Sequence, residues 1–352
     1  MYPRIVTNLA KLEHNLNEVL TRCQRNRITR SFLVVKVLAG EKQIVEKLAK
    51  YDFEYLADSR LLNLRKFRDI PKKKALLRLP MPSEISETIR DADLSLNSEI
   101  STIRLLNQAA IEQGKIHEIL LMFDLGDLRE GIYYTDPYLP VVKEILSLPA
   151  IRLVGIGTNL TCFGGLIPTP AILSRLVNIK EAIDAEFHFP LDIISGGNSS
   201  SFYLFDDPGL PPEINSLRYG EIVFMGRETA YGTLLKGLYP DIFTLEAQLI
   251  ECQVKPSLPD GETGMNSFGV KTSFIDKGPM RRGILAIGKQ DVQLENLSPR
   301  DKDVFIVGGS SDHLIVDLSR TNYHLGDILQ FDVNYPGLLH LMNSPYVKKE
   351  MQ

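Results

Sequence analysis

The sequence predicts an α/β protein: a (β/α)8 barrel of the TIM type, followed by a smaller, mostly β domain. Two observations predict this fold. Short apolar runs alternate with amphipathic segments over about the first two thirds of the 352 residues, and the alternation then stops. Eight strands, each followed by a helix or a loop, in a segment of this length match a (β/α)8 barrel in number and size. A doubly wound open sheet is the main alternative, because local patterns do not show whether a sheet closes.

The predicted barrel strands are short runs rich in Val, Ile and Leu, as expected for strands that are buried on both faces. In chain order they are Ser31–Leu38, Phe53–Ala57, Ala75–Leu79, Asp93–Asn97, Glu118–Leu125, Arg152–Leu160, Leu191–Gly196 and Leu217–Met225. The segments between them have the periodicity of amphipathic helices. In chain order these are Asn8–Arg25, Glu41–Lys50, Asp58–Phe67, Ser98–Gln113, Tyr138–Leu146 and Ala171–Phe187.

Helical periodicity fades after Gly232, and apolar runs then recur at intervals that are typical of an all-β domain. These runs are Phe243–Lys255, Arg282–Ile287, Asp303–Val307, His313–Asp317 and Asp327–Val333. We therefore expect a barrel domain over residues 1–235 and a C-terminal β domain over residues 236–352. The first few residues of the chain are available to pair with the β domain.

The composition excludes several classes of protein. The chain has 40 Lys and Arg against 44 Asp and Glu, a net charge of −4, whereas a dedicated nucleic-acid binder needs a basic excess. It is 44% hydrophobic, too apolar for a disordered chain, yet no stretch reaches the ~18–20 apolar residues of a membrane span. The N-terminal residues lack an apolar signal segment, and the three widely spaced cysteines do not suit a disulfide framework. We expect a cytoplasmic protein with no nucleic-acid or membrane partner.

The first candidate for chemistry is Lys36, which interrupts the apolar run Phe32–Ala39. We expect a lysine inside such a strand to be mostly desolvated, and burial lowers the pKa of an ammonium group. A lysine with a lowered pKa suits a Schiff-base nucleophile or a general base. The alternative is a lysine near the strand end that reaches solvent or pairs with a carboxylate. Active-site groups project from the ends of barrel strands, which favours the functional interpretation.

Three further groups of polar residues lie on or directly after predicted strands. The segment Ser195–Ser201 combines glycines for a tight turn with Asn198 and Ser199, which suit a helix N-cap and an anion-binding loop. Arg218 interrupts the eighth strand, and Arg129 belongs to a charged segment after the fifth. The structural alternatives are a capped glycine turn, a salt bridge and a solvated turn, respectively.

The six histidines show no metal-ligand spacing, so no metal site is predicted. Only His313, in the segment Ser310–Leu314, has acidic and hydroxyl neighbours that suggest a further role.

Taken in chain order, these residues resemble the fold-type III family of pyridoxal-phosphate (PLP) enzymes, the alanine racemases. The alanine/ornithine racemase-like branch is the most similar, and the resemblance covers nearly the whole chain. It rests on motifs that occur in the family's order. They are Val34-Val35-Lys36, Asp124–Gly131, Thr158-Asn159, Asn198-Ser199, Arg218-Tyr219-Gly220, Ser311-Asp312 and Asn334-Tyr335.

The resemblance implies a role for each matching residue. Lys36 would form a Schiff base with PLP and move a proton on one face of the substrate α-carbon. Arg218 would face the pyridine nitrogen, with Asn159 and Asn198 also near the cofactor. Arg129 would position a cofactor oxygen or the substrate carboxylate. The remaining cofactor ligands would bind the phosphate: Ser199, the backbone N–H groups of Gly220 and Glu221, and the hydroxyl of Tyr335. The family's sites are completed by the β domain of a partner subunit, which implies a homodimer.

Two departures from the family pattern concern catalysis. Asn159 stands where the family usually has histidine, and no tyrosine occurs in residues 261–269, where the second catalytic base is expected. Racemisation by two bases needs a proton donor on each face of the α-carbon. His313 and Asp312 are candidates for the second base, with His313 the stronger, and Asn266 and Ser267 would orient rather than transfer. The alternative for His313 is a substrate-binding or supporting role.

The resemblance implies an isomerase that interconverts L- and D-amino acids by abstraction of the α-proton, with ornithine or another basic or small amino acid as substrate. Ser311 and Asp312 would then contact the substrate, and Asp312 suits a side-chain ammonium. Other classes stay open at this stage. They are a PLP-dependent decarboxylase, a D-hydroxy-amino-acid aldolase, or a non-catalytic PLP carrier.

Overall fold

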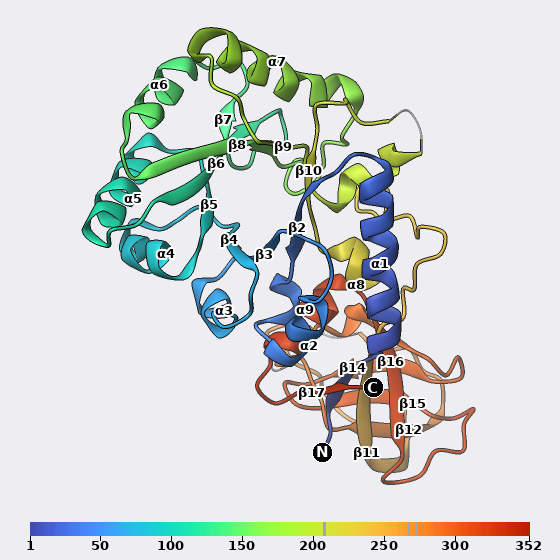
Figure 1. Ribbon diagram of the computed structural model, residues 1–352. Helices are drawn as coiled ribbons and strands as arrows, with labels where there is room; N and C mark the ends of the chain where they lie inside the picture. The colour runs from blue at the N-terminus through green and yellow to red at the C-terminus, as the bar shows by residue number, and fades with distance from the viewer. Residues whose placement is uncertain (207–208, 267, 272) are drawn as a thin grey trace. The chain divides into compact units, whose positions relative to one another are not determined.

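The computed structural model describes residues 1–206, 209–266, 268–271 and 273–352. The chain divides into two compact units (Figure 1). One unit is formed by Lys11–Pro240, and the other combines Met1–Ala10 with Asp241–Gln352.

The parallel strands of the first unit close into a ring. Their order is β5-β4-β3-β2-β10-β9-β8-β6, and β5 also pairs with β6, so the first and last strands are joined. The predicted barrel is therefore confirmed, and the open sheet is wrong. The ring strands are β2 (Arg30–Val34), β3 (Tyr55–Asp58), β4 (Lys73–Leu76), β5 (Leu94–Asn97), β6 (His117–Asp124), β8 (Ile151–Thr158), β9 (Ile193–Ser195) and β10 (Ser216–Tyr219), with β7 (Ile132–Tyr133) beside β6.

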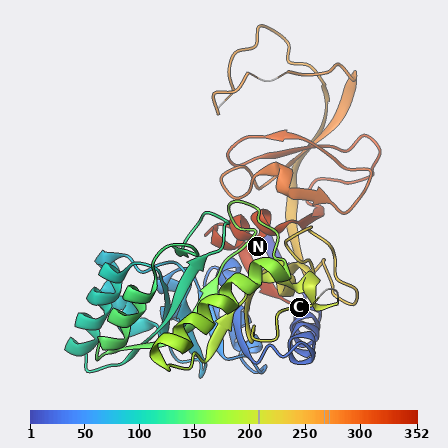
Figure 2. The same cartoon turned by 90° about the horizontal axis from the view of Figure 1, so that it is seen from above.

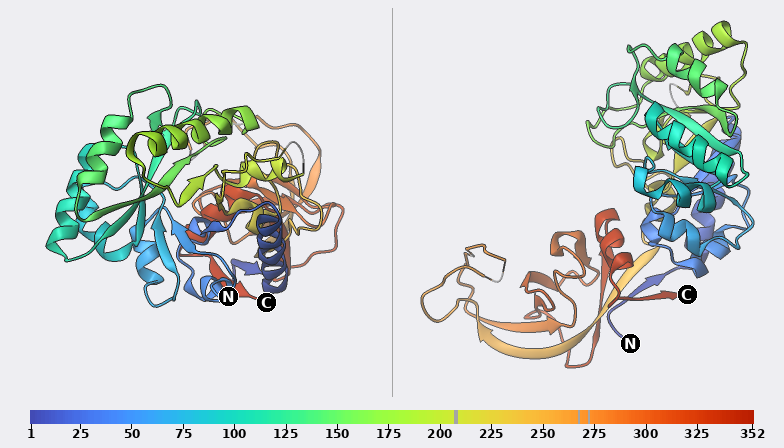
Figure 3. Two further views of the ribbon diagram at one scale, coloured as in Figure 1. Left: turned by 45° about the horizontal axis from the view of Figure 1, so that its top comes forward. Right: turned by 90° about the vertical axis from the view of Figure 1, so that its left-hand side faces the viewer.

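Helices lie on the outside of the ring of strands, as Figure 3 shows from two sides. They are α1 (Leu9–Arg25), α2 (Lys42–Leu48), α3 (Leu61–Lys66), α4 (Ile85–Asp91), α5 (Ile100–Glu112), α6 (Leu139–Ser147), α7 (Pro170–Phe187) and α8 (Glu221–Met225), with 3-10 turns η1 (Lys36–Leu38), η2 (Pro82–Glu84) and η3 (Ser199–Phe205). Each longer helix presents apolar residues to the strands; α1, for example, buries Leu12, Leu16 and Val19. Among the described residues, no helix combines the length and the hydropathy that crossing a bilayer requires.

The interior of the barrel is filled by side chains from its strands. Phe32 on β2 and Tyr55 on β3 are partners in register, and their rings stack with centroids 4.4 Å apart. Small residues such as Ala57 and Ala75 leave room for these rings, and all four side chains are fully buried. The barrel interior is therefore a packed core, so a small molecule can bind only at one of its ends.

Several predicted strands end earlier than expected, by the largest margins after β2 and β10. The run Ser31–Leu38 leaves the sheet after Val34, where η1 begins, and Leu217–Met225 is split at Gly220 into β10 and α8. The physical reason is visible at Gly220, where a Cβ atom would lie 2.6 Å from the carbonyl oxygen of Val34. Only glycine allows the chain to turn this close to β2. Helix α4, a short helix in the segment that follows β4, was not among the predicted helices.

The second unit is mostly β, as predicted. Its eight-stranded sheet has the order β13-β16-β11-β12-β15-β14, and β1 pairs with both β11 and β17. Strands β11 and β12 form a long antiparallel hairpin, visible in Figure 2. The elements are β1 (Arg4–Thr7), β11 (Phe243–Pro256), β12 (Pro279–Leu285), β13 (Leu297–Pro299), β14 (Phe305–Gly309), β15 (Leu314–Asp317), β16 (Ile328–Val333), β17 (Lys348–Met351), η4 (Leu294–Asn296) and α9 (Tyr335–Asn343).

Candidate active site

The candidate residues of the barrel gather at one of its ends. Because all ring strands are parallel, their carboxyl ends meet on the same side. Lys36 follows β2, and Asn159 follows β8. Asn198 and Ser199 follow β9, while Arg218, Gly220 and Glu221 lie at the end of β10 and directly beyond it. The structure thus brings these seven residues to one end of the barrel.

Lys36 is the first residue of η1 and is exposed, so the expectation that it is desolvated within a strand is wrong. The last ladder contact of β2 runs from the N–H of Val35 to the carbonyl of Ala57, at 2.8 Å. The chain then turns, and Val37 and Leu38 enter the core. Lys36 is thereby left facing outward from the strand end. Within the described part of the barrel, its ammonium makes no hydrogen bond or ion pair.

Arg218 is a buried cation near the carboxyl end of β10. Its Nη1 donates to Ser195 Oγ at 2.6 Å, and its Nη2 donates to the backbone carbonyl of Thr158. Burial lowers the pKa of the guanidinium to about 10, although the charge of Glu130 opposes this effect. The group is therefore still a cation at neutral pH, and it can donate hydrogen bonds but not accept them.

The loop after β9 is organised by Asn198, which caps η3 as the sequence predicted. Its Oδ1 accepts from the N–H of Ser200 at 2.8 Å, and its Nδ2 donates to Asn159 Oδ1 at 2.8 Å. Ser199 is buried next to the end of β10. Its Oγ accepts from the N–H of Gly220 at 3.3 Å. Hydroxyl and N–H groups from two neighbouring loops are therefore held together, as the binding of an anion requires.

Two buried hydroxyls at this end lack a partner. Thr158 Oγ1 and Ser200 Oγ have no hydrogen-bond partner among the residues that the structure describes. A buried polar atom without a partner costs about 1–3 kcal/mol and therefore needs an explanation. A bound group that carries hydrogen-bond acceptors would supply the missing partners.

Glu130 connects residues that the sequence analysis singled out separately. Arg129 donates to it through Nη2 at 2.7 Å, and Asn159 Nδ2 donates to the same oxygen at 3.2 Å. Arg129 was predicted as a site residue, but Glu130 was not. The signal available in the sequence was the mixture of opposite charges directly after the predicted fifth strand.

The remaining candidates lie in the second unit. Ser311, Asp312 and His313 form the turn between β14 and β15. Nδ1 of His313 lies 2.9 Å from Asp312 Oδ1, and Ser311 Oγ donates to the same oxygen at 3.2 Å. Hydrogen bonds from Ser310 and then His313 lower the pKa of the Asp312 carboxyl. The side chains of His313 and Asp312 are 43% and 57% exposed, respectively, so both are accessible.

Two further predicted residues have defined local settings. Tyr335 is the first residue of α9 and half-buried, and Asn334 caps this helix by accepting from the N–H of Gly337 at 2.9 Å. Asn266 uses its Oδ1 to accept from the N–H groups of Phe268 and Val270, so this atom is engaged in a local turn. Ser267 lies outside the described residues.

Comparison with known proteins identifies the family. The family "Alanine racemase, N-terminal domain" matches residues 7–228. Ornithine racemase from Acetoanaerobium sticklandii is 44% identical over 353 residues and covers 100% of both chains. Lysine racemase from Thermotoga maritima is 35% identical over 352 residues, which cover 99% of this chain and 98% of that one. The structure of alanine racemase from Bartonella henselae with covalently bound pyridoxal phosphate has a TM-score of 0.74 at 16% identity and covers 100% of both chains. This chain, with its barrel, its β unit and the lysine at the end of β2, belongs to the alanine racemase family.

Proposed function

We propose that this protein is a PLP-dependent amino-acid racemase that interconverts the L- and D-forms of a basic amino acid, with ornithine as the first candidate. The observation that carries the proposal is the exposed Lys36 ammonium at the carboxyl end of the barrel, in a chain that matches an ornithine racemase from end to end. The relative at 35% identity, a lysine racemase, supports the same class of substrate.

The residues at the end of the barrel fit PLP. An unpaired lysine amine suits the capture of an aldehyde. Ser199 Oγ and the N–H groups of Gly220 and Glu221 are suited to a phosphate, and the buried hydroxyls of Thr158 and Ser200 lack partners that acceptor atoms would supply. Tyr335 would add a fourth phosphate ligand. When bound, the cofactor draws electrons from the substrate α-carbon, which makes its proton removable.

Arg218 sets the electronic character of the site. Its guanidinium is held by Ser195 and Thr158, and it presents only donors. A donor that faces a ring nitrogen keeps that nitrogen unprotonated, which limits how strongly negative charge accumulates during the reaction. Asn198 donates to Asn159 at 2.8 Å, and Asn159 directly follows Thr158, whose carbonyl accepts from Arg218.

Proton transfer uses one group on each face of the α-carbon. Lys36 Nζ accepts the α-proton on one face, and His313 Nε2 donates a proton on the other. The Asp312 carboxylate accepts from Nδ1–H of His313, so Nε2 is the nitrogen that gains a proton to form the imidazolium and then gives that proton to the α-carbon. We propose that His313 comes from the β domain of a partner subunit, residues 236–352, and serves the barrel of the first subunit, residues 1–235. The exposure of the Asp312–His313 pair and the family resemblance support this arrangement.

Charged side chains define the ends of the substrate. Arg129 is exposed at the rim and can bind the substrate carboxylate as a cation. All three hydrogen bonds to Asp312 from Ser310, Ser311 and His313 involve Oδ1, so the other oxygen faces away from this cluster. That oxygen and the hydroxyl of Ser311 suit the side-chain ammonium of ornithine or lysine.

We further propose that the enzyme works in the cytoplasm. Cys23, Cys162 and Cys252 are free thiols, as expected for a reducing compartment.

The test is incubation of the PLP-loaded enzyme with L-ornithine, L-lysine and L-alanine in deuterated water. We expect D-ornithine or D-lysine to form faster than D-alanine, with deuterium on the α-carbon of both enantiomers. Release of carbon dioxide would indicate a decarboxylase, and release of an aldehyde with glycine would indicate an aldolase. Absence of any reaction despite bound PLP would favour a carrier.

A further inference from the structure

A buried carboxylate organises the loop after β8. Asp127 is fully buried, and its two oxygens accept from four backbone N–H groups of residues 161–166. Oδ1 accepts from Thr161 at 3.0 Å and from Leu166 at 2.9 Å. Oδ2 accepts from Cys162 at 3.1 Å and from Phe163 at 2.9 Å. Hydrogen bonds to a carboxylate are about twice as strong as those between neutral groups, so this side chain holds both ends of the loop.

The loop has a shape that its own sequence does not favour. Thr161 has a φ of 59°, in the left-handed region that a β-branched residue rarely adopts. Gly164 lies against the backbone of Asp127: its N–H donates to the Asp127 carbonyl at 2.9 Å, and a Cβ atom would lie 2.7 Å from the same oxygen. Such a conformation persists only where its surroundings impose it, and Asp127 supplies the contacts that do so.

The segment after α8 is organised in the same way by Glu228. This side chain is also fully buried, and it accepts from the N–H groups of Ala230 at 2.7 Å, Tyr231 at 3.2 Å and Thr233 at 2.8 Å. The N–H of Glu228 donates to the carbonyl of Thr233 at 3.1 Å, which closes the turn. The Tyr231 ring packs edge-on against Tyr203 on η3, with the ring centroids 5.3 Å apart. Glu228 therefore shapes a turn that packs against η3.

Both loops contact Asn198, the residue that caps η3. Its Nδ2 donates to the carbonyl of Leu160 at 2.8 Å and to Cys162 Sγ at 3.3 Å, both in the segment after β8. From the other loop, the hydroxyl of Thr229 lies 3.5 Å from Asn198 Oδ1. The same Oδ1 accepts from the N–H of Ser200 at 2.8 Å. The side chain that fixes the start of η3 is thus held by the two loops that the buried carboxylates organise.

We propose that Asp127 and Glu228 are positioning residues for the cofactor site: each holds one loop in contact with Asn198, and through it they fix the start of η3, where the phosphate of PLP would bind. Donors that are already fixed bind an anion more tightly, because less order is lost on binding. This inference rests on the proposed function, because the loops act in this way only in a chain that binds PLP.

The test compares Asp127→Asn and Glu228→Gln with the unchanged chain. Each substitution keeps the size of the side chain and replaces one oxygen by an amide NH2, so backbone N–H groups lose an acceptor. The matched control is Glu118→Gln, which removes a buried carboxylate at the amino end of the same barrel. Each full-length protein, freed of cofactor, is titrated with PLP and separately with pyridoxal, and near-visible absorption gives the two dissociation constants. The two aldehydes share the group that reacts with Lys36 and differ in the phosphate.

We expect the dissociation constant of PLP to rise about tenfold in Asp127→Asn, whose loop makes two hydrogen bonds with Asn198. The rise should be smaller in Glu228→Gln, whose loop makes a longer contact. Pyridoxal should bind all four proteins within about twofold, and the control should bind PLP normally. An equal loss of affinity for both aldehydes would indicate a general loss of structure and overturn the inference, as would an unchanged preference for PLP in both variants. If one variant does not fold, the other decides by itself.

The binding measurement does not depend on the reaction. A lost preference for PLP in variants of a protein that racemises no amino acid would refute the proposed function and leave the positioning role intact. An unchanged preference in variants of an active racemase would do the reverse. An unchanged chain that binds neither aldehyde would overturn both.

Discussion

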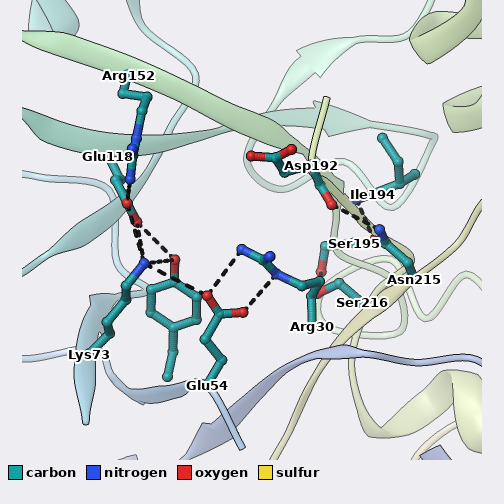
Figure 4. A network of polar contacts seen from close by, with 11 residues as sticks. Arg30, Glu54, Lys73, Glu118, Arg152, Asp192, Ile194, Ser195, Asn215 and Ser216 are labelled. Atoms are coloured by element: carbon teal, nitrogen blue, oxygen red, sulfur yellow. Dashed lines mark hydrogen bonds and ion pairs between the residues drawn. The ribbon is translucent and has the colours of Figure 1, made fainter. Parts of the chain in front are cut away.

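The charged side chains at the two ends of the barrel differ in how they are paired. At the amino end of the strands, Glu118 accepts from the Tyr55 hydroxyl at 2.8 Å and pairs with Lys73 and Arg152, as Figure 4 shows. Glu54 continues this network to Lys73 at 3.7 Å. At the carboxyl end, the Lys36 ammonium has no ion pair within the described barrel, and two buried hydroxyls lack partners.

This difference in charge pairing indicates that the amino end of the barrel contributes mainly to stability, whereas the carboxyl end carries the function. The network at the amino end connects β3, β4, β6 and β8, and its charges compensate one another without a ligand. Nearby, Asn215 joins the segments before β9 and β10, because it accepts from the N–H of Ile194 and donates to the carbonyl of Asp192, both at 2.8 Å. The carboxyl end keeps donors and charges available, which is typical of the catalytic face of this fold.

The largest expected difference between the two ends is in activity, and it is tested by replacing one lysine at each end. Lys36→Ala should abolish covalent binding of the cofactor and lower racemisation by at least about 10³-fold, because it removes both the link and a base. Lys73→Ala, the matched control, should bind the cofactor and turn over normally. The measurements are the near-visible absorption spectrum and a chiral assay of D-ornithine. Residual racemisation close to the unchanged level in Lys36→Ala would remove this residue from the mechanism.

The next effect concerns the second base in the β unit. His313→Gln should lower racemisation by about 10²–10⁴-fold, because no group then donates a proton on the second face. In deuterated water, one enantiomer should still exchange its α-proton without being converted. Asp312→Asn should have a smaller effect, since the imidazole stays in place but loses its orienting charge. If His313→Gln exchanges both enantiomers at the normal rate, another group is the second base.

At the amino end, the expected loss is in stability rather than in activity. Glu118→Gln leaves Lys73 and Arg152 without their shared carboxylate, which is only 9% exposed. We expect the free energy of unfolding to fall by about 2 kcal/mol, with kcat and KM unchanged, because both cations can still turn toward solvent. Urea denaturation and steady-state kinetics measure the two quantities. A large drop in kcat with unchanged stability would contradict the separation of the two ends.

The remaining effects appear only when the pH is changed, and they have opposite signs at the two ends. Burial lowers the pKa of His117, at the start of β6, to about 4. Its unfolded pKa is higher, about 6.5, so its contribution to stability is present above pH 6.5 and is lost as pH falls toward 4. Asp58 and Glu221 have pKa values raised to about 6 and 7, so they lower stability as pH rises toward 7.

Removal of each titrating group should weaken the dependence of the free energy of unfolding on pH over the range in which that group titrates. His117→Gln should reduce the loss between pH 6.5 and 4 by about 2–3 kcal/mol, and Asp58→Asn should raise the free energy of unfolding at pH 8 by about 2 kcal/mol. Urea midpoints measured from pH 4 to 8 test both. Parallel curves for either variant and the unchanged protein would show that its group does not titrate differently on folding.

Much of the fold was predictable because it depends on local patterns. Hydrophobic periodicity located every ring strand, and the change of texture after Gly232 located the β unit. The burial of Lys36 was predicted wrongly, since the turn that follows Val34 depends on contacts with β10. Those contacts join residues far apart in the chain, so a local pattern does not contain them.

The candidate site was predicted in part for the same reason. Arg218 and Asn198 follow strands and could be singled out by residue type. Asp58 was assigned to the start of a helix, whereas it is the last residue of β3. The contact between Ser199 and the N–H of Gly220 joins the loops that follow β9 and β10, which no single segment of sequence reveals.

The pairing of β1 has a consequence for biosynthesis. Arg4–Thr7 hydrogen-bond to β11 on one side and to β17 on the other, so both partners leave the ribosome long after β1 does. The whole barrel is translated in between. During synthesis, β1 therefore has neither of its partner strands until the residues of the barrel have been translated. A solubility tag or a chaperone that covers the nascent N-terminal strand should therefore raise the yield of folded enzyme.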